Sequence, residues 1–150
     1  MFDLKAEDLF FHVKQAMGKY QESKSKSIEK LFFIIMGLNH LREWIAPGYK
    51  YDRESPSPVT KEHKFFVKIY NELPEFKTIN ASCNGIKHLE SSQNTDAKYG
   101  LKIDDWGLFD DVQSFDDGPP SKFTVDGVDI EIILKKVIDF YSKEWFDKNI

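Results

Sequence analysis

The residues best suited to chemistry lie between Pro74 and Glu90, where amides, an amine and an imidazole recur at helical spacing. If this segment is a helix, Asn80, Asn84 and His88 form one row along it, and Lys87 lies beside that row. The apolar face of the same helix consists of four residues: Phe76, Ile79, Cys83 and Ile86. Such a rigid polar edge could bind an anion or move a proton, with His88 as the general acid or base.

A second group of polar residues lies earlier, in the run His40-Leu41-Arg42-Glu43-Trp44. His40 and Trp44 are neighbours at i, i+4 spacing, so Trp44 is predicted to pack and His40 to hydrogen-bond across to the segment 74–90. Together with His88, His40 and Glu43 resemble a two-histidine, one-carboxylate metal set, but the spacing is not HExxH. We therefore expect no metal and no cofactor, and we predict His40, Glu43 and Asn80 as binding residues.

The run Cys83-Asn84-Gly85-Ile86-Lys87-His88 resembles the motif of the HEPN superfamily, small helical domains of prokaryotic toxins and phage-defence proteins. That motif is an arginine, often followed by asparagine, and then a histidine late in a helix of a bundle. Asn84 and His88 match the polar position and the histidine, whereas Cys83 stands where the family has arginine. The chain also resembles uncharacterised bacterial helical proteins that pair an HLxxW helix with an NGxKH helix.

The resemblance implies a homodimeric helical bundle that cleaves RNA without metal, in a phage-defence or stress-response setting. His88 would then deprotonate the 2′-hydroxyl, while Asn84 and Lys87 steady the phosphate. Because the arginine is missing, the alternative is a non-catalytic module that binds a protein partner. A purely structural interpretation also stands, in which His88 caps the last carbonyls of its helix. Whether the protein is an enzyme is left open at this point.

The composition indicates one globular domain that does not enter a membrane. A chain of 150 residues is long enough to build a single core, and its net charge of −4 disfavours a general nucleic-acid coat protein without excluding a local basic site. Its one cysteine, Cys83, excludes an intramolecular disulfide and is expected to be an unreactive core thiol. The first twenty residues contain no signal-peptide-like apolar region, and the longest apolar run, Leu31–Leu38, is far shorter than a membrane span. A cytoplasmic location is expected.

Hydrophobic periodicity predicts the elements that must position these residues. The expected fold is mainly α, an up-and-down bundle of four to five helices with a small antiparallel hairpin before the last one, in a single domain 1–150. Helices are expected at 4–22, 28–45, 60–73, 74–90 and 131–148, with Asp3 and Ser27 as N-caps. Strands are expected at 99–103, 122–125 and 128–130, the last two joined by Asp126-Gly127. The acidic stretch 104–117 does not match a calcium-binding loop and is expected to be a solvated loop.

The core is expected to form around one group of apolar side chains. Its members are Leu31, Phe32, Ile35, Leu38, Ile79, Ile86, Val137 and Phe140. Leu4 and Tyr70 are also placed on buried faces of their helices. Because the run 31–38 is apolar nearly all round, we expect its helix to be central in the domain.

Overall fold

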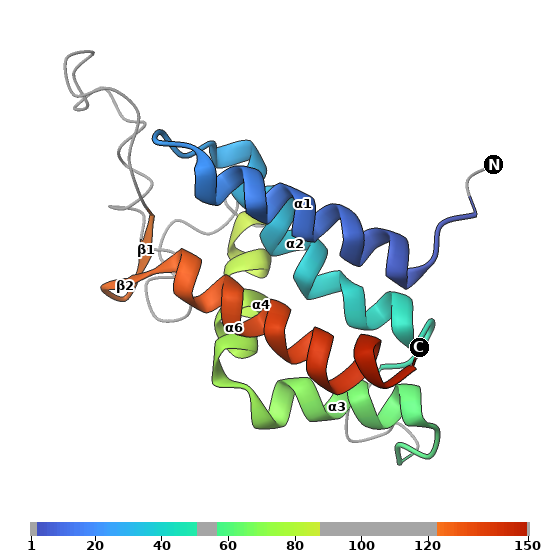
Figure 1. Cartoon of the computed structure of the whole chain (residues 1–150). Helices are drawn as coiled ribbons and strands as arrows, with labels where there is room; N and C mark the ends of the chain where they lie inside the picture. The colour runs from blue at the N-terminus through green and yellow to red at the C-terminus, as the bar shows by residue number, and fades with distance from the viewer. Residues whose placement is uncertain (1–2, 51–56, 88–122, 150) are drawn as a thin grey trace.

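A computed structural model describes residues 3–50, 57–87 and 123–149. The protein is mainly helical, with a small two-stranded antiparallel sheet before the last helix, as the sequence predicted (Figure 1). The elements are α1 (Ala6–Glu22), α2 (Ile28–Ile45), α3 (Lys61–Glu72), α4 (Pro74–Lys87), β1 (Thr124–Val125), β2 (Val128–Asp129) and α6 (Ile130–Tyr141). After α6 the chain continues as a π-helix at Ser142–Phe146 and a 3₁₀ turn at Asp147–Asn149.

Local hydrogen bonds fix where the helices begin. The hydroxyl of Ser27 accepts the Lys30 N–H at the start of α2, which confirms the predicted cap. Thr60 is the N-cap that precedes α3, and its hydroxyl accepts the His63 N–H. The prediction for α1 was wrong by two residues, because the Asp8 carboxylate accepts the Lys5 N–H and places the cap at Lys5 instead of Asp3.

The core surrounds α2, which contacts α1, α3, α4 and α6. Five of the eight predicted core residues are fully buried: Leu31, Ile35, Leu38, Ile79 and Val137. Phe32 and Phe140 are only half-buried, and the side chain of Ile86 lies outside the described residues. The helix is therefore central, as predicted, and its fully buried residues link it to α4 and α6.

The buried faces of three helices are narrower than their apolar sequences suggest. Leu4 precedes α1 and is 54% exposed, and Tyr70 on α3 is 38% exposed. On α2, Phe33 and Met36 are also exposed, because α1, α3, α4 and α6 leave one side of that helix uncovered among the described residues. The prediction of Leu4 and Tyr70 as buried was wrong, since apolar periodicity does not reveal how many neighbours a helix has.

A tight hairpin leads into the last helix. Thr124 pairs with Asp129 and Val125 with Val128, so the Asp-Gly turn falls where the sequence predicted it. Asp126 and Gly127 both have positive φ, 50° and 84°, as this turn requires. The α-helical part of the final segment then ends at Tyr141 instead of Lys148, because the π-helix begins at the next residue.

Several predictions fall on parts of the chain that the structure does not describe. These are the strand at 99–103, the acidic stretch 104–117 and the residues of the fourth helix beyond Lys87. In the described ranges, no helix has the length and apolar character needed to cross a membrane.

Candidate functional site

The three predicted binding residues, His40, Glu43 and Asn80, lie in a polar seam between α2 and α4. The seam also contains Asn39 and Cys83. The seam begins with an amide pair, in which Asn80 Nδ2 donates to Asn39 Oδ1 at 2.8 Å. Asn39 is only 5% exposed, so this hydrogen bond satisfies a polar group that the core would otherwise leave unpaired. Asn80 was predicted to bind a ligand, and it joins the two helices here.

His40, the residue after Asn39, lies between a carboxylate and a thiol. Its Nδ1 is 2.7 Å from Glu43 Oε2, and its Nε2 is 3.9 Å from Cys83 Sγ. A carboxylate accepts hydrogen bonds, so the Nδ1–H of His40 is directed at Glu43, and Nε2 faces the thiol. The predicted contact from His40 across to α4 is confirmed, and its partner is Cys83.

This Glu–His–Cys arrangement has the order of a catalytic relay, but its thiol is enclosed. Cys83 is 0% exposed, so a substrate cannot approach the sulfur in this conformation. The prediction that Cys83 is a core residue is confirmed, while its contact with His40 was not predicted. Only the rotation of α2 against α4 brings the two residues together, and no pattern within either segment specifies that rotation.

The rest of the predicted row divides at the end of α4. Asn84 is exposed on that helix. Lys87 is the last residue of α4, its side chain lies outside the described residues, and so does His88. The structure therefore brings His40, Glu43 and Asn80 to one seam and leaves the proposed catalytic group of Asn84, Lys87 and His88 without a described geometry.

Arg42, on the neighbouring face of α2, contacts both α3 and α4. This role was not predicted from the sequence. Its guanidinium lies 4.0 Å from the ring centre of Phe66 and 4.9 Å from that of Phe76. Nη1 also donates to the Phe66 carbonyl at 3.1 Å. Burial lowers the pKa of Arg42, yet an arginine starts so high that it stays charged, which makes this a cation–π contact between α2, α3 and α4.

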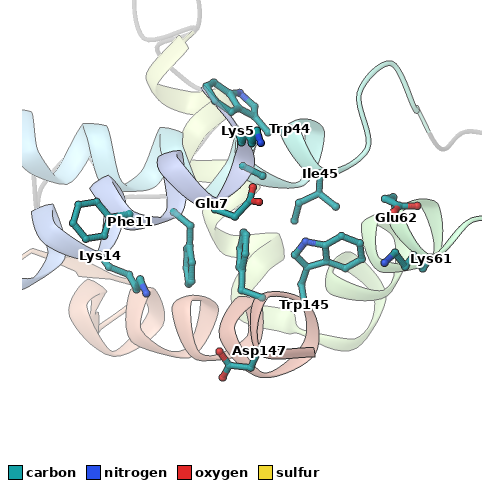
Figure 2. Close-up of a pocket in the computed structure, with 13 residues that line it drawn as sticks. Lys5, Glu7, Phe11, Lys14, Trp44, Ile45, Lys61, Glu62, Trp145 and Asp147 are labelled. Carbon is teal, nitrogen blue, oxygen red and sulfur yellow. The ribbon is translucent and has the colours of Figure 1, made fainter. Parts of the chain in front are cut away.

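A cavity of about 780 Å³ lies where α1, the end of α2, the start of α3 and the C-terminal segment meet (Figure 2). We call it the aromatic hollow. Its ring-bearing lining residues are Phe10, Phe11, Trp44, Trp145 and Phe146. Its rim carries three lysines and three carboxylates: Lys5, Lys14, Lys61, Glu7, Glu62 and Asp147.

A smaller cavity of about 270 Å³, the lysine hollow, adjoins it. Lys61, Lys64 and Lys68 follow one face of α3, and Lys148 faces them from the C-terminal segment. Among its described lining residues Glu144 is the one carboxylate, and it binds Lys68 at 2.8 Å and Lys148 at 3.1 Å. The hydrogen bond from Lys68, followed by that from Lys148, lowers the pKa of Glu144.

Neither hollow was predicted from the sequence. The spacing of Lys61, Lys64 and Lys68 was visible as a basic helix face, but their contact with Trp145 and Lys148 was not.

Within the described ranges, no group of three or more His, Cys, Asp and Glu side chains is arranged to hold a metal ion. Comparison with known proteins finds no matching family model, and neither a curated protein nor a solved structure with detectable similarity.

Proposed function

We propose that this protein is a non-catalytic helical binding module with a HEPN-like layout, and not an RNA-cleaving enzyme. The observation that supports this most directly is the environment of Cys83, which occupies the position of the motif's arginine. Its side chain is completely buried and contacts His40. A residue oriented in this way cannot present a cation to RNA from the edge of α4.

The amide pair in the seam supports the same proposal. The side-chain amide of Asn80 donates a hydrogen bond to Asn39, so it contributes to holding α2 against α4. Replacing Cys83 by arginine in this environment would bury a guanidinium, which is costly without a paired anion. The setting in phage defence or stress response, and binding of an RNA or protein partner, are part of the proposal and come from the motif resemblance.

An RNA-cleavage assay tests the proposal directly. Wild-type protein should leave single-stranded RNA intact in the presence of EDTA, and His88→Ala should behave identically. Cys83→Arg serves as the complementary variant, with circular dichroism to establish whether it folds. Metal-independent cleavage by the wild type that His88→Ala abolishes, at unchanged thermal stability, would show instead that His88 is catalytic with Asn84 and Lys87 as its partners.

The dimer implied by the resemblance is tested separately by sedimentation velocity. A two-fold dimer is the commonest closed assembly and would place two copies of the α4 edge together. A sedimentation coefficient that rises with concentration in the micromolar range is the expected result. A monomer throughout that range would exclude a composite site between two copies, while leaving the proposal of a non-catalytic module intact.

A further inference from the structure

The two hollows are neighbours that share Trp145 and Lys61 in their linings, and we call the pair the groove. Figure 2 shows the Trp145 indole below Ile45, with Lys61 and Glu62 to one side and Asp147 beneath. Lys61 Nζ lies 5.7 Å from the ring centre of Trp145, at the point where the hollows meet. A ligand that spans this point would contact rings at one end and lysines at the other.

The aromatic end of the groove provides flat surfaces that are firmly held. Phe10 and Phe146 stack with their ring centres 4.4 Å apart and their planes 8° from parallel. Trp145 is half-buried and packs against the buried Phe65 at 5.4 Å, while Trp44 on the opposite wall is 40% exposed. Because Phe10 is buried and stacked on Phe146, the two tryptophans are the rings that a planar group would contact. A volume of this size lies within the usual range for small-ligand sites.

The charges divide unequally between the two ends. Apart from Lys61, which lines both hollows, the described residues of the aromatic hollow include two lysines and three carboxylates. Those of the lysine hollow include three lysines and the single carboxylate of Glu144, so the positive charge is concentrated at the lysine end. An anionic group is therefore favoured at the lysine end, and hydrogen-bond donors are favoured near the carboxylates of the aromatic end.

We propose that this groove binds a nucleotide, with its base stacked on Trp145 and its phosphate beside Lys61 and Lys64. The carboxylates of Glu7, Glu62 and Asp147 suit the exocyclic amino group of adenine or cytosine, because a carboxylate accepts from such a group. A free nucleotide and a nucleotide within single-stranded RNA share this chemistry. The groove uses none of the residues of the α2–α4 seam, so nucleotide binding here can be tested apart from the loss of catalysis proposed above.

Isothermal titration calorimetry on the full chain tests this inference with AMP as the probe. Adenosine and inorganic phosphate, titrated separately, supply the two halves of the ligand, and both should bind more weakly than AMP. AMP should also bind more tightly than IMP, which lacks the exocyclic amino group. Raising the salt concentration should weaken AMP binding, because exposed lysines are screened.

Two charge reversals locate the groove. Lys64→Glu should weaken AMP binding about tenfold, since it replaces attraction to the phosphate by repulsion. Lys136→Glu is the matched control, because Lys136 is exposed on α6 and lines neither hollow. The affinity of this variant for AMP should stay within about twofold of wild type. Trp145→Leu should weaken binding about fivefold or more through lost stacking, with circular dichroism to show that it folds.

A short single-stranded oligoadenylate distinguishes the two sources of the nucleotide. Affinity that rises with strand length, and falls steeply with salt, would assign the groove to RNA, whereas equal affinity for AMP and the strand would assign it to the free nucleotide. Absence of saturable AMP and oligoadenylate binding at millimolar concentration would overturn the inference. Equal weakening by Lys64→Glu and Lys136→Glu would overturn it as well, because binding would then follow overall charge alone. RNA cleavage by the wild type would refute the non-catalytic function without affecting this result.

Discussion

Two buried tyrosines show how differently the same residue type serves this core. The Tyr141 hydroxyl donates to the Leu38 carbonyl at 2.7 Å, whereas the buried Tyr20 hydroxyl has no hydrogen-bond partner among the described residues. Both rings are almost completely enclosed. The first hydroxyl therefore contributes a hydrogen bond, while the second contributes only the cost of its desolvation.

Removing each hydroxyl in turn should separate these effects. Tyr141→Phe should lower the free energy of unfolding by about 1 kcal/mol, because one buried hydrogen bond is lost. Tyr20→Phe is the matched control and should leave stability unchanged or slightly raised. Urea denaturation followed by circular dichroism measures both, and an equal loss in the two variants would contradict the assigned hydrogen bond.

The hydrogen bond between Asn39 and Asn80 gives a second prediction at the scale of single residues. Either Asn39→Ala or Asn80→Ala leaves its partner's amide unsatisfied in the seam, so each should cost about 1–3 kcal/mol of stability. The double variant should cost less than the sum of the two, with a coupling energy of about 1 kcal/mol. Thermal and urea unfolding of all four proteins give this coupling, and strict additivity would show that the amides do not interact.

At the scale of elements, α1 and α2 approach each other closely at Gly37. A Cβ atom built on Gly37 would come within 2.6 Å of Val13 Cγ2. Val13 is fully buried and belongs to the main core, so it has little room to move away. The glycine therefore permits the helices to pack at this distance despite its poor helix propensity.

Adding one methyl group at two glycines tests this packing. Gly37→Ala should lower the free energy of unfolding by about 1–3 kcal/mol through overpacking. Gly18→Ala on α1 is the control, since a Cβ atom there meets nothing within 4 Å, and it should raise stability by about 0.5–1 kcal/mol through helix propensity. Differential scanning calorimetry should show melting temperatures that move in opposite directions.

The elements themselves were predictable because their signals are local. Ser27 caps α2, Pro74 begins α4 and the Asp-Gly pair makes the hairpin, and each of these depends on a few adjacent residues. The contacts between elements were not predictable in the same way. The seam depends on the rotation of α2 against α4, and the groove depends on a C-terminal segment that leaves α-helical geometry.

At the scale of the whole molecule, the net charge of −4 conceals an uneven distribution. Residues 88–122 contain eight Asp and Glu side chains but only three lysines. The described ranges hold 17 lysines and arginines against 15 acidic residues, so they carry a small positive charge. The composition argued against a chain basic throughout, but it could not reveal that four lysines gather on one surface.

The buried tyrosines also give the whole protein a pH dependence. Burial raises the pKa of Tyr141 above its ordinary value of about 10, and burial together with the charges of Asp129 and Glu131 raises that of Tyr20. The folded state then holds these protons where the unfolded state releases them, so stability is present below pH 10 and declines as pH rises above it. Urea unfolding between pH 8 and about 11 should show this decline, and the Tyr20→Phe/Tyr141→Phe protein should show a shallower one.

The π-helix at Ser142–Phe146 means that the last helix carries one residue more than an uninterrupted α-helix needs to cover the same length. If the same residues adopted regular α-helical geometry in this stretch, the side chains beyond it would turn by about 100° around the axis. Phe146 would then leave its stack with Phe10, and Trp145 would leave the point where the two hollows meet. The groove therefore depends on the rotational position of these side chains around the helix axis as much as on their being aromatic. A change that alters no aromatic or lysine residue could abolish it.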